Sequence, residues 1–254
     1  MGEGALAVVR FTGEGARHAA GACAAIVTGR IKFARAVEQV HQIGAMSLPI
    51  VTIALFFTGM VMALHVATAL KAYGASLRLA EIVLVSMVRE LSPIFTALLV
   101  CGRAGSGITA ELGSMQLSEQ LSAMRALSLD IVAELVAPRV LATVAATVFL
   151  TATGDLAGVL GGYLVAIQRE QILFDTYHAE TVKALAMTDV WCGLFKSALF
   201  GFGIATIGCT YGLRTRAGAG ELGRNTKSAV VIASFCVLVS NYFLTELYGL
   251  LFER

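Results

Sequence analysis

Charged residues are scarce in this chain of 254 residues, where Asp, Glu, Lys and Arg together make up 14% of the sequence. A soluble domain carries about 25% charged residues. Hydrophobic residues make up 57% and the mean hydropathy is +0.78, which is more apolar surface than a globule of this size can bury. A lipid bilayer solvates such an excess, so the composition excludes an ordinary soluble domain.

Several common site signatures are also missing. The five cysteines form no CxxC pair and no two of the four histidines have ligand spacing such as HExxH, so a metal site is not expected. The net charge is only +2 and no basic run is interleaved with aromatic residues, so nucleic acid is not an expected partner. No Ser/His/Asp set indicates catalysis, and Thr226 stands where a P-loop ending in Lys227 would need glycine. We therefore predict a chain that is not an enzyme and holds no cofactor.

Five long apolar stretches predict the fold. Each is long enough to cross the hydrocarbon core, which takes about 20 residues of helix. Helices are required there because every backbone polar group must find its partner internally. The fold class is therefore all-α, a polytopic membrane protein. The five predicted spans cover about residues 48–70, 79–102, 141–166, 189–212 and 228–250.

Two further segments are predicted to lie at the membrane surface without crossing it. Residues 15–40 mix apolar side chains with several basic ones, which is typical of an amphipathic helix in the interface, although a plain tail is the alternative. Residues 107–127 show apolar residues at helical spacing and predict a short amphipathic helix. The predicted domains are a tail with an interfacial helix at 1–47 and a transmembrane domain at 48–250.

The distribution of Lys and Arg predicts the orientation. Basic residues gather in the N-terminal segment, after the second span and after the fourth span, and they are sparser in the other loops. Basic loops stay in the cytoplasm, so the N-terminus is predicted to be cytoplasmic. With five spans, the C-terminus then lies on the opposite side of the membrane.

Two adjacent charges interrupt the second predicted span. Arg89 and Glu90 must face a bundle interior or a wet cavity, because a charge at the bilayer centre costs about 2.5–3.5 kcal/mol. Neighbouring helical positions point about 100° apart, so the two residues need not pair with each other. Pro93 frees the carbonyl of Arg89, which favours a kink or a local opening. A structural ion pair and a substrate or gating role both satisfy these constraints.

Asp155 and Lys196 are lone charges in the third and fourth predicted spans. They could pair with each other across helices, and a packing role is as reasonable as a functional one. The same two spans carry glycines at four-residue spacing, which predicts close helix packing. These glycines are Gly154, Gly158, Gly162, Gly208 and Gly212.

The stretch 89–125 reads RELSPIFTALLVCGRAGSGITAELGSMQLSEQLSAMR. It resembles the signature of the MlaE-type permeases, the membrane subunits of lipid-transporting ABC systems that work with MCE proteins. The motifs RELxP at 89–93, GR at 102–103, AELG at 110–113 and EQ at 119–120 match as they stand. The similarity covers about residues 40–250. Asn241 is a departure, because the family commonly has Asp at that position.

The resemblance implies a set of partners. Permeases of this type form a homodimer, bind two ABC ATPase subunits on the cytoplasmic face and meet a ring of MCE-domain chains on the other face. A STAS-domain regulator often accompanies the ATPase, which binds the ATP and Mg²⁺. The implied substrate is a phospholipid or another lipid. The implied location is the cell inner membrane, as a multi-pass protein with a periplasmic C-terminus.

The resemblance also implies roles for particular residues. Segment 107–127 corresponds to the helix that couples the permease to the ATPase. The expected ATPase-coupling residues are Arg103, Glu111, Glu119, Gln120 and Arg125. The residues expected to line or gate the substrate cavity are Arg89, Glu90, Pro93 and Asn241.

Two other functions are compatible with the residues. An ion- or proton-coupled secondary transporter would use intramembrane carboxylates such as Glu90 and Asp155 as proton carriers, and its flux would not depend on ATP. A membrane anchor for a cytoplasmic complex would transport nothing, and its intramembrane charges would tolerate neutral replacement.

Overall fold

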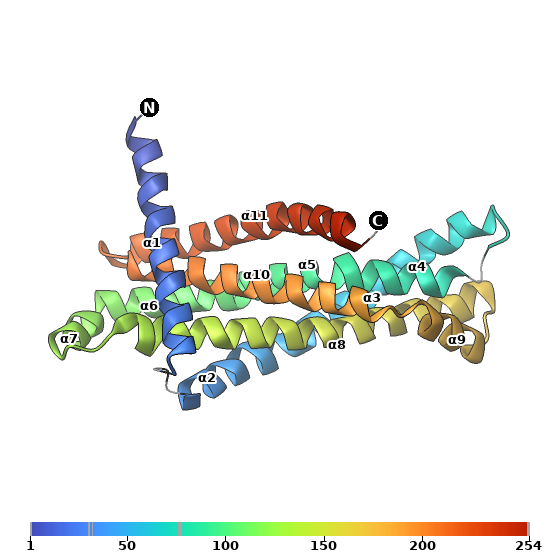
Figure 1. Ribbon diagram of the computed structural model, residues 1–254, viewed down its shortest axis with the longest axis horizontal. Helices are drawn as coiled ribbons and strands as arrows, with labels where there is room; N and C mark the ends of the chain where they lie inside the picture. Colours follow the sequence, from blue (N-terminus) through green and yellow to red (C-terminus); the bar gives the residue numbers. More distant parts are fainter. Residues whose placement is uncertain (1, 30, 32, 76–77, 253–254) are drawn as a thin grey trace. The chain divides into compact units, whose positions relative to one another are not determined.

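The computed structural model describes residues 2–29, 31, 33–75 and 78–252, and these form helices joined by short connections, with no strand among them (Figure 1). The predicted all-α fold class is confirmed. The helices are α1 (Gly2–Val27), α2 (Phe33–Val40), α3 (Met46–Lys71), α4 (Leu79–Ser86), α5 (Ser92–Val100), α6 (Ser106–Leu117), α7 (Gln120–Ala126), α8 (Ala137–Glu170), α9 (Phe174–Ala184), α10 (Met187–Leu213) and α11 (Gly218–Phe252). Single π-helical turns continue several of them: His41–Ala45, Met87–Leu91, Cys101–Gly105 and Val132–Val136.

Five helical stretches in the described part of the chain are long and apolar enough to cross a membrane. Each of the five predicted spans lies inside one of them, so the prediction of five transmembrane helices is confirmed. The helices are longer than the predicted spans because helical backbone continues past the apolar residues. The stretches are Ala34–Lys71, Leu79–Leu117, Val132–Glu170, Met187–Leu213 and Gly218–Leu250. The division into a tail at 1–47 and a transmembrane domain at 48–250 stays a prediction.

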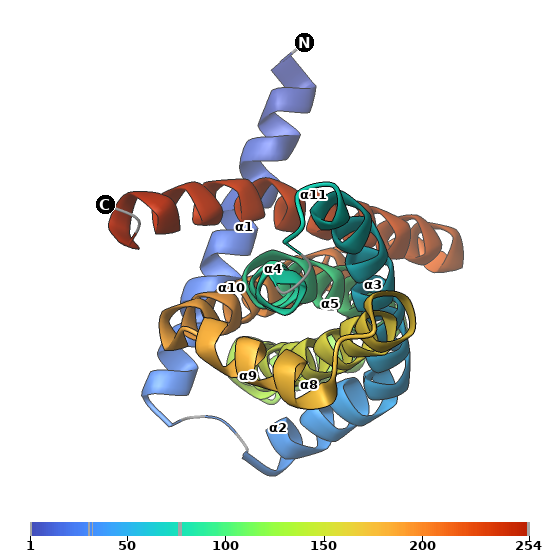
Figure 2. The same cartoon turned by 90° about the vertical axis from the view of Figure 1, so that its right-hand side faces the viewer.

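The N-terminal segment differs from the single helix expected over residues 15–40. α1 ends at Val27 and α2 begins at Phe33, and both views show two separate helices (Figures 1 and 2). Gly29, between them, has a φ of +67°, a left-handed conformation that glycine adopts without steric cost. That the segment lies in the membrane interface stays a prediction.

The segment 107–127 is also interrupted. α6 ends at Leu117 and α7 begins at Gln120. The Ser118 hydroxyl donates to the carbonyl of Ser114 at 2.9 Å and closes the end of α6, and Glu119 takes a left-handed φ of 59°. The apolar spacing did not reveal this break, because a left-handed residue other than glycine has no clear sequence signal.

The chain divides into two compact units, and each is described by itself. Unit 1 comprises Met1–Ala45, Val100–Ala146 and Leu199–Leu238. In unit 1 the glycines of α10 lie against α6. A Cβ on Gly208 would lie 3.1 Å from the Gly105 carbonyl oxygen, and one on Gly212 would lie 2.9 Å from that of Thr109. The predicted close packing at these two glycines is confirmed.

α1 docks onto the C-terminal end of α10 within unit 1. His18 Nδ1 lies 3.1 Å from Thr210 Oγ1, and Glu14 forms an ion pair with Arg214 at 2.9 Å. Partial burial lowers the pKa of His18 below its usual 6.5, against a smaller raising effect of Glu14, so its ring is neutral at pH 7. A neutral ring can share a hydrogen bond with the threonine hydroxyl without bringing a further charge into this contact.

Unit 2 comprises Met46–Leu99, Thr147–Ala198 and Val239–Arg254. Here the glycines of α8 let it approach two other helices. A Cβ on Gly59 of α3 would lie 2.0 Å from the Gly158 carbonyl oxygen, and a Cβ on Gly162 would lie 2.8 Å from Val83 of α4. Gly154 faces Leu55 of α3 in the same way. The stripe of small residues on the third span is therefore confirmed as a packing surface.

Unit 2 also exposes a row of large apolar side chains on α3. Ile50, Ile53, Phe57 and Val61 are each more than half exposed. Such a row would be an aggregation hazard in water, whereas acyl chains solvate it. The row accounts for part of the high hydropathy of the sequence.

Replacing Gly59 by Ala should destabilise the protein by about 1–3 kcal/mol, because the new methyl group meets a backbone oxygen that cannot move away alone. The matched control is Gly107→Ala, where nothing lies within 4 Å and helix propensity favours Ala. Thermal unfolding of the detergent-solubilised protein, followed by the fluorescence of its single tryptophan, measures both. Equal unfolding midpoints for the two variants would contradict the packing described.

Candidate functional site

Lys196, on α10, is a cation buried in unit 2, with 1% of its surface exposed. Its ammonium lies 2.7 Å from Glu90 Oε1, 3.1 Å from the Arg89 carbonyl oxygen and 2.8 Å from Thr245 Oγ1. An ammonium has three donors, and three acceptors surround this one. The complete set of partners allows a charged lysine to persist away from water.

Pro93 explains why the Arg89 carbonyl is available to Lys196. A residue at position 93 would normally donate its N–H to that carbonyl, and proline has no N–H. The turn Met87–Leu91 is π-helical, and the N–H of Ser92 bonds to the carbonyl of Met87. The local opening of the helix expected at Pro93 is confirmed. The Lys196 ammonium donates to the Arg89 carbonyl that this opening leaves free. Gly193 permits the close approach of α10, since a Cβ there would lie 2.2 Å from the Val88 carbonyl oxygen.

Glu90 joins the π-helical turn to both α10 and α11. Besides the Lys196 ammonium, it accepts a bond from Asn241 Nδ2 at 3.1 Å, and Thr245 Oγ1 lies 2.9 Å from its Oε1. An ionised aspartate at position 241 could not donate to Glu90 and would repel it. The asparagine found in this chain therefore suits a carboxylate partner.

Arg89 and Glu90 contact different residues. The Arg89 Nε lies 3.7 Å from Asp189 Oδ1, and the Arg89 guanidinium lies 4.7 Å from the centre of the Tyr248 ring. The Tyr248 hydroxyl donates to the same Asp189 oxygen at 2.7 Å. The adjacent charges in the second span thus take separate partners, as the 100° offset between neighbouring positions allows. Together these side chains form the network, defined as Arg89, Glu90, Asp189, Lys196, Asn241, Thr245 and Tyr248.

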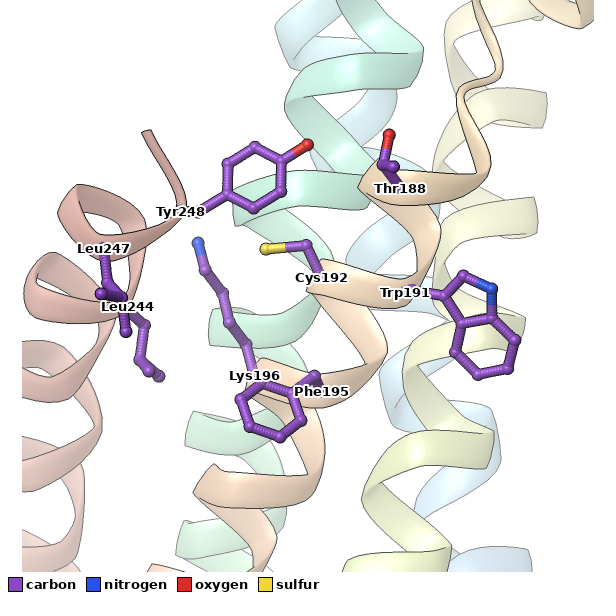
Figure 3. A pocket seen from close by; sticks show the side chains of 8 residues that line it. All are labelled: Thr188, Trp191, Cys192, Phe195, Lys196, Leu244, Leu247 and Tyr248. Carbon is purple, nitrogen blue, oxygen red and sulfur yellow. The ribbon is translucent and has the colours of Figure 1, made fainter. Parts of the chain in front are cut away.

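An apolar cavity of about 430 Å³ adjoins the network between α10 and α11 (Figure 3). The Lys196 side chain extends from α10 toward Tyr248 on α11, and these two residues belong to both the network and the cavity wall. The other lining residues are Thr188, Trp191, Cys192, Phe195, Leu244 and Leu247. An apolar cavity of this size can hold an acyl or alkyl group.

Asp155, the other lone charge considered from the sequence, is not the partner of Lys196. The pairing of Asp155 with Lys196 across helices does not occur, because Glu90 holds the lysine. Asp155 Oδ1 and Ser92 Oγ are both buried in unit 2. The sequence offered two carboxylates for one lysine, and only the helix packing selects between them.

The five expected coupling residues all lie in unit 1, outside the network. Glu111, on α6, pairs with Arg139 of α8 at 2.7 Å, and Glu119 lies exposed at the left-handed turn. Arg103 lies in the turn Cys101–Gly105, and Gln120 and Arg125 are exposed on α7. Their contact with an ATPase stays a prediction.

Sequence reasoning missed several polar residues that the packing brings together. Asp189, Thr245 and Tyr248 are ordinary near the ends of apolar helices, so no signal singled them out. Arg139, which is 5% exposed, looked like a basic residue of a loop. A buried arginine at a span boundary is a detectable signal only once its carboxylate partner is known.

Comparison with known proteins places this architecture in a family. The family model for permease MlaE matches residues 36–247. This chain belongs to the MlaE permease family. It is 37% identical to a probable ABC transporter permease protein of Rickettsia bellii, over 98% of this chain and 96% of that protein. It is 29% identical to the intermembrane phospholipid transport system permease protein MlaE of Haemophilus influenzae, over 86% of this chain and 84% of that protein.

A chloroplast protein is also similar to this chain. The protein TRIGALACTOSYLDIACYLGLYCEROL 1 of Arabidopsis thaliana is 30% identical over 88% of this chain and 64% of its own length. The alignment with several relatives named ABC transporter permeases identifies this chain as a membrane subunit of that class.

Lys196→Met should destabilise the protein, because it leaves Glu90 without its cation. Breaking a fully buried pair costs about 3–5 kcal/mol, and the cost here should be smaller because the Glu90 side chain is 32% exposed. The double variant Lys196→Met/Glu90→Gln should recover much of the loss. Unfolding midpoints in detergent measure all variants.

The matched control for this experiment is Lys183→Met. Lys183 and Glu180 form a pair at 2.6 Å on α9, with side chains 70% and 34% exposed. An exposed pair contributes about 0–1 kcal/mol, so this variant should unfold close to the wild type. A double variant no more stable than Lys196→Met would refute the pairing as the source of the loss.

Proposed function

We propose that this chain is the permease subunit of an ABC transporter that moves a lipid, with phospholipid as the substrate class, between the inner membrane and an MCE-protein channel. A separate ATPase drives the movement and binds the ATP and Mg²⁺. The family and the relatives named ABC transporter permeases support the transporter class. The relative named for intermembrane phospholipid transport supports the substrate class.

The observation that carries the proposal is a charged network that is only partly closed beside an apolar cavity. Arg89 and Glu90 keep 24% and 32% of their side chains exposed, whereas Lys196 keeps 2%. The buried lysine therefore acts as a fixed support, and the arginine remains within reach of a ligand. A guanidinium binds a phosphate with two parallel hydrogen bonds, and the apolar lining suits an acyl chain.

Unit 1 supplies the element through which an ATPase acts in this proposal. The ion pair of Glu111 with the buried Arg139 fastens α6 to the first turn of α8, the helix of the third span. A displacement of the turn at Glu119 by the ATPase would then be transmitted to α8 through the Glu111–Arg139 ion pair. Glu119 and Gln120 are exposed at this turn, where a partner can reach them.

The remaining assembly follows the family pattern. The proposed complex is a homodimer of this chain with two ATPase subunits, an MCE-domain protein and a STAS-domain regulator. Its N-terminus is cytoplasmic and its C-terminus periplasmic, as the basic loops indicate. The secondary-transporter alternative differs in a measurable way, because it requires flux in the absence of ATP.

Arg89→Ala should lower ATP-dependent lipid transport about tenfold or more, because it removes a charge-assisted contact of about 1.5–3 kcal/mol with the headgroup. Transfer of a fluorescent phospholipid from proteoliposomes containing the full complex measures this. Arg169→Ala, at the exposed end of α8, is the control and should transport normally. Transport by Arg89→Ala at the wild-type rate would remove Arg89 from the mechanism. Flux that persists without ATP would support the alternative.

Glu119→Lys should uncouple ATP hydrolysis from lipid transport, because the reversed charge repels whatever Glu119 contacts on the ATPase. The expected result is retained hydrolysis with reduced transfer, measured in the same proteoliposomes. Glu119→Asp keeps the charge and tolerates the left-handed φ of 59°, so it should stay coupled. Normal coupling in Glu119→Lys would discard the docking assignment.

A further inference from the structure

Unit 1 contains a second cavity, of about 680 Å³, whose walls carry an excess of positive charge. Its charged lining residues come from three segments: α1, α7 and the connection that follows α10. Arg10, Glu14 and Arg17 are spaced at i, i+4 and i+7, so they share one face of α1. The charged side chains of this cavity, called the arginine cavity below, are Arg10, Glu14, Arg17, Arg125, Arg214 and Arg216.

The positive charge of the arginine cavity is only partly offset by the protein. Glu221, which does not line the cavity, accepts a hydrogen bond from the backbone N–H of Arg216. The one carboxylate that lines the cavity, Glu14, is already engaged by Arg214 at 2.9 Å, and the Arg214 guanidinium also lies 5.4 Å from the centre of the Phe11 ring. Within the described residues, no carboxylate forms an ion pair with Arg10, Arg17, Arg125 or Arg216. Converging like charges repel one another, so an anion placed among them would be stabilised.

The depth of the arginine cavity identifies the kind of anion. One of its apolar lining residues is Leu213, the last residue of the fourth spanning stretch, directly after the predicted span that ends at about residue 212. The ends of spanning helices lie at the level of the lipid headgroups. Basic pockets at that level attract acidic lipids. The apolar lining residues Ile131, Val132 and Leu213 beside the arginines match the join between a headgroup and its acyl chains.

We propose that the arginine cavity binds a phosphate group, supplied by the headgroup of an acidic phospholipid. The guanidinium groups of three separate segments donate to the phosphate oxygens, and the apolar lining residues receive the adjoining glycerol region. This lipid is a fixed ligand and differs from transported cargo, because the cavity shares no residue with the network of unit 2. One bound headgroup would tie α1 to α7, which carries part of the proposed coupling segment. The binding itself requires no transport.

The test is lipid binding by the purified full-length chain in a neutral detergent, measured by native mass spectrometry. The probes are phosphatidylglycerol, phosphatidylcholine and inorganic phosphate. The wild type should retain phosphatidylglycerol in preference to phosphatidylcholine. The double variant Arg10→Gln/Arg17→Gln should bind phosphatidylglycerol about thirtyfold more weakly, since it removes two basic contacts that are each worth about 1 kcal/mol.

The matched control is Arg224→Gln/Lys227→Gln, which removes the same charge from exposed positions of unit 1 that do not line the cavity. It should bind phosphatidylglycerol like the wild type. Arg10 and Arg17 are exposed, so the cavity variant should unfold at the wild-type temperature without lipid. Arg125→Gln tests the same site from a different helix and should weaken binding in the same direction.

Three results would overturn the proposal. Equal losses in the cavity variant and the control would show general charge attraction. Equal binding of the two lipids would show no preference for an acidic headgroup. Arginine-dependent binding of inorganic phosphate without a preference for phosphatidylglycerol would assign the site to a free anion and remove the headgroup as its source.

Discussion

Burying an ammonium ion among membrane-spanning helices removes it from water, and much of unit 2 follows from the partners that Lys196 then needs. Glu90 supplies the opposite charge, Thr245 supplies a hydroxyl and Arg89 supplies its backbone carbonyl. That carbonyl is free because Pro93 cannot donate to it. Pro93 and Lys196 are 103 positions apart in the sequence. Together they hold the π-helical turn Met87–Leu91 against α10, because one frees the carbonyl and the other binds it.

Close helix contacts make such a network possible. Without a hydrophobic driving force between helices in lipid, packing depends on small residues that let backbones approach. Gly193 brings α10 to the opened turn, and Gly59 and Gly158 bring α3 to α8. A side chain on any of the three would meet a neighbouring group at far less than contact distance. The polar network is therefore held by a packed frame, in which Arg89 keeps part of its side chain exposed.

The two units concentrate charge for different purposes in the proposals above. In the network of unit 2, Arg89 pairs with Asp189 and Glu90 pairs with Lys196, and the network stands beside an apolar cavity that would suit a lipid in transit. In unit 1 the Glu111–Arg139 pair joins α6 to α8, whereas the arginine cavity keeps an excess of positive charge where the spans end. In the proposed function, the MlaE permease family suggests a transported lipid and a coupled ATPase. In the further proposal, the arginines without an ion-pair partner bind a resident lipid.

Composition and the spacing of apolar residues were enough to determine the five spans and the all-α class, because the hydrocarbon core demands helices about 20 residues long. The sequence also singled out Arg89, Glu90 and Pro93, since charge and proline are exceptional in such a helix. It could not choose Glu90 over Asp155 as the partner of Lys196, or place Asp189, Thr245 and Tyr248 beside them. Those choices depend on which helix faces meet, and lipid-facing and partner-facing residues are equally apolar, so only the tertiary packing decides them.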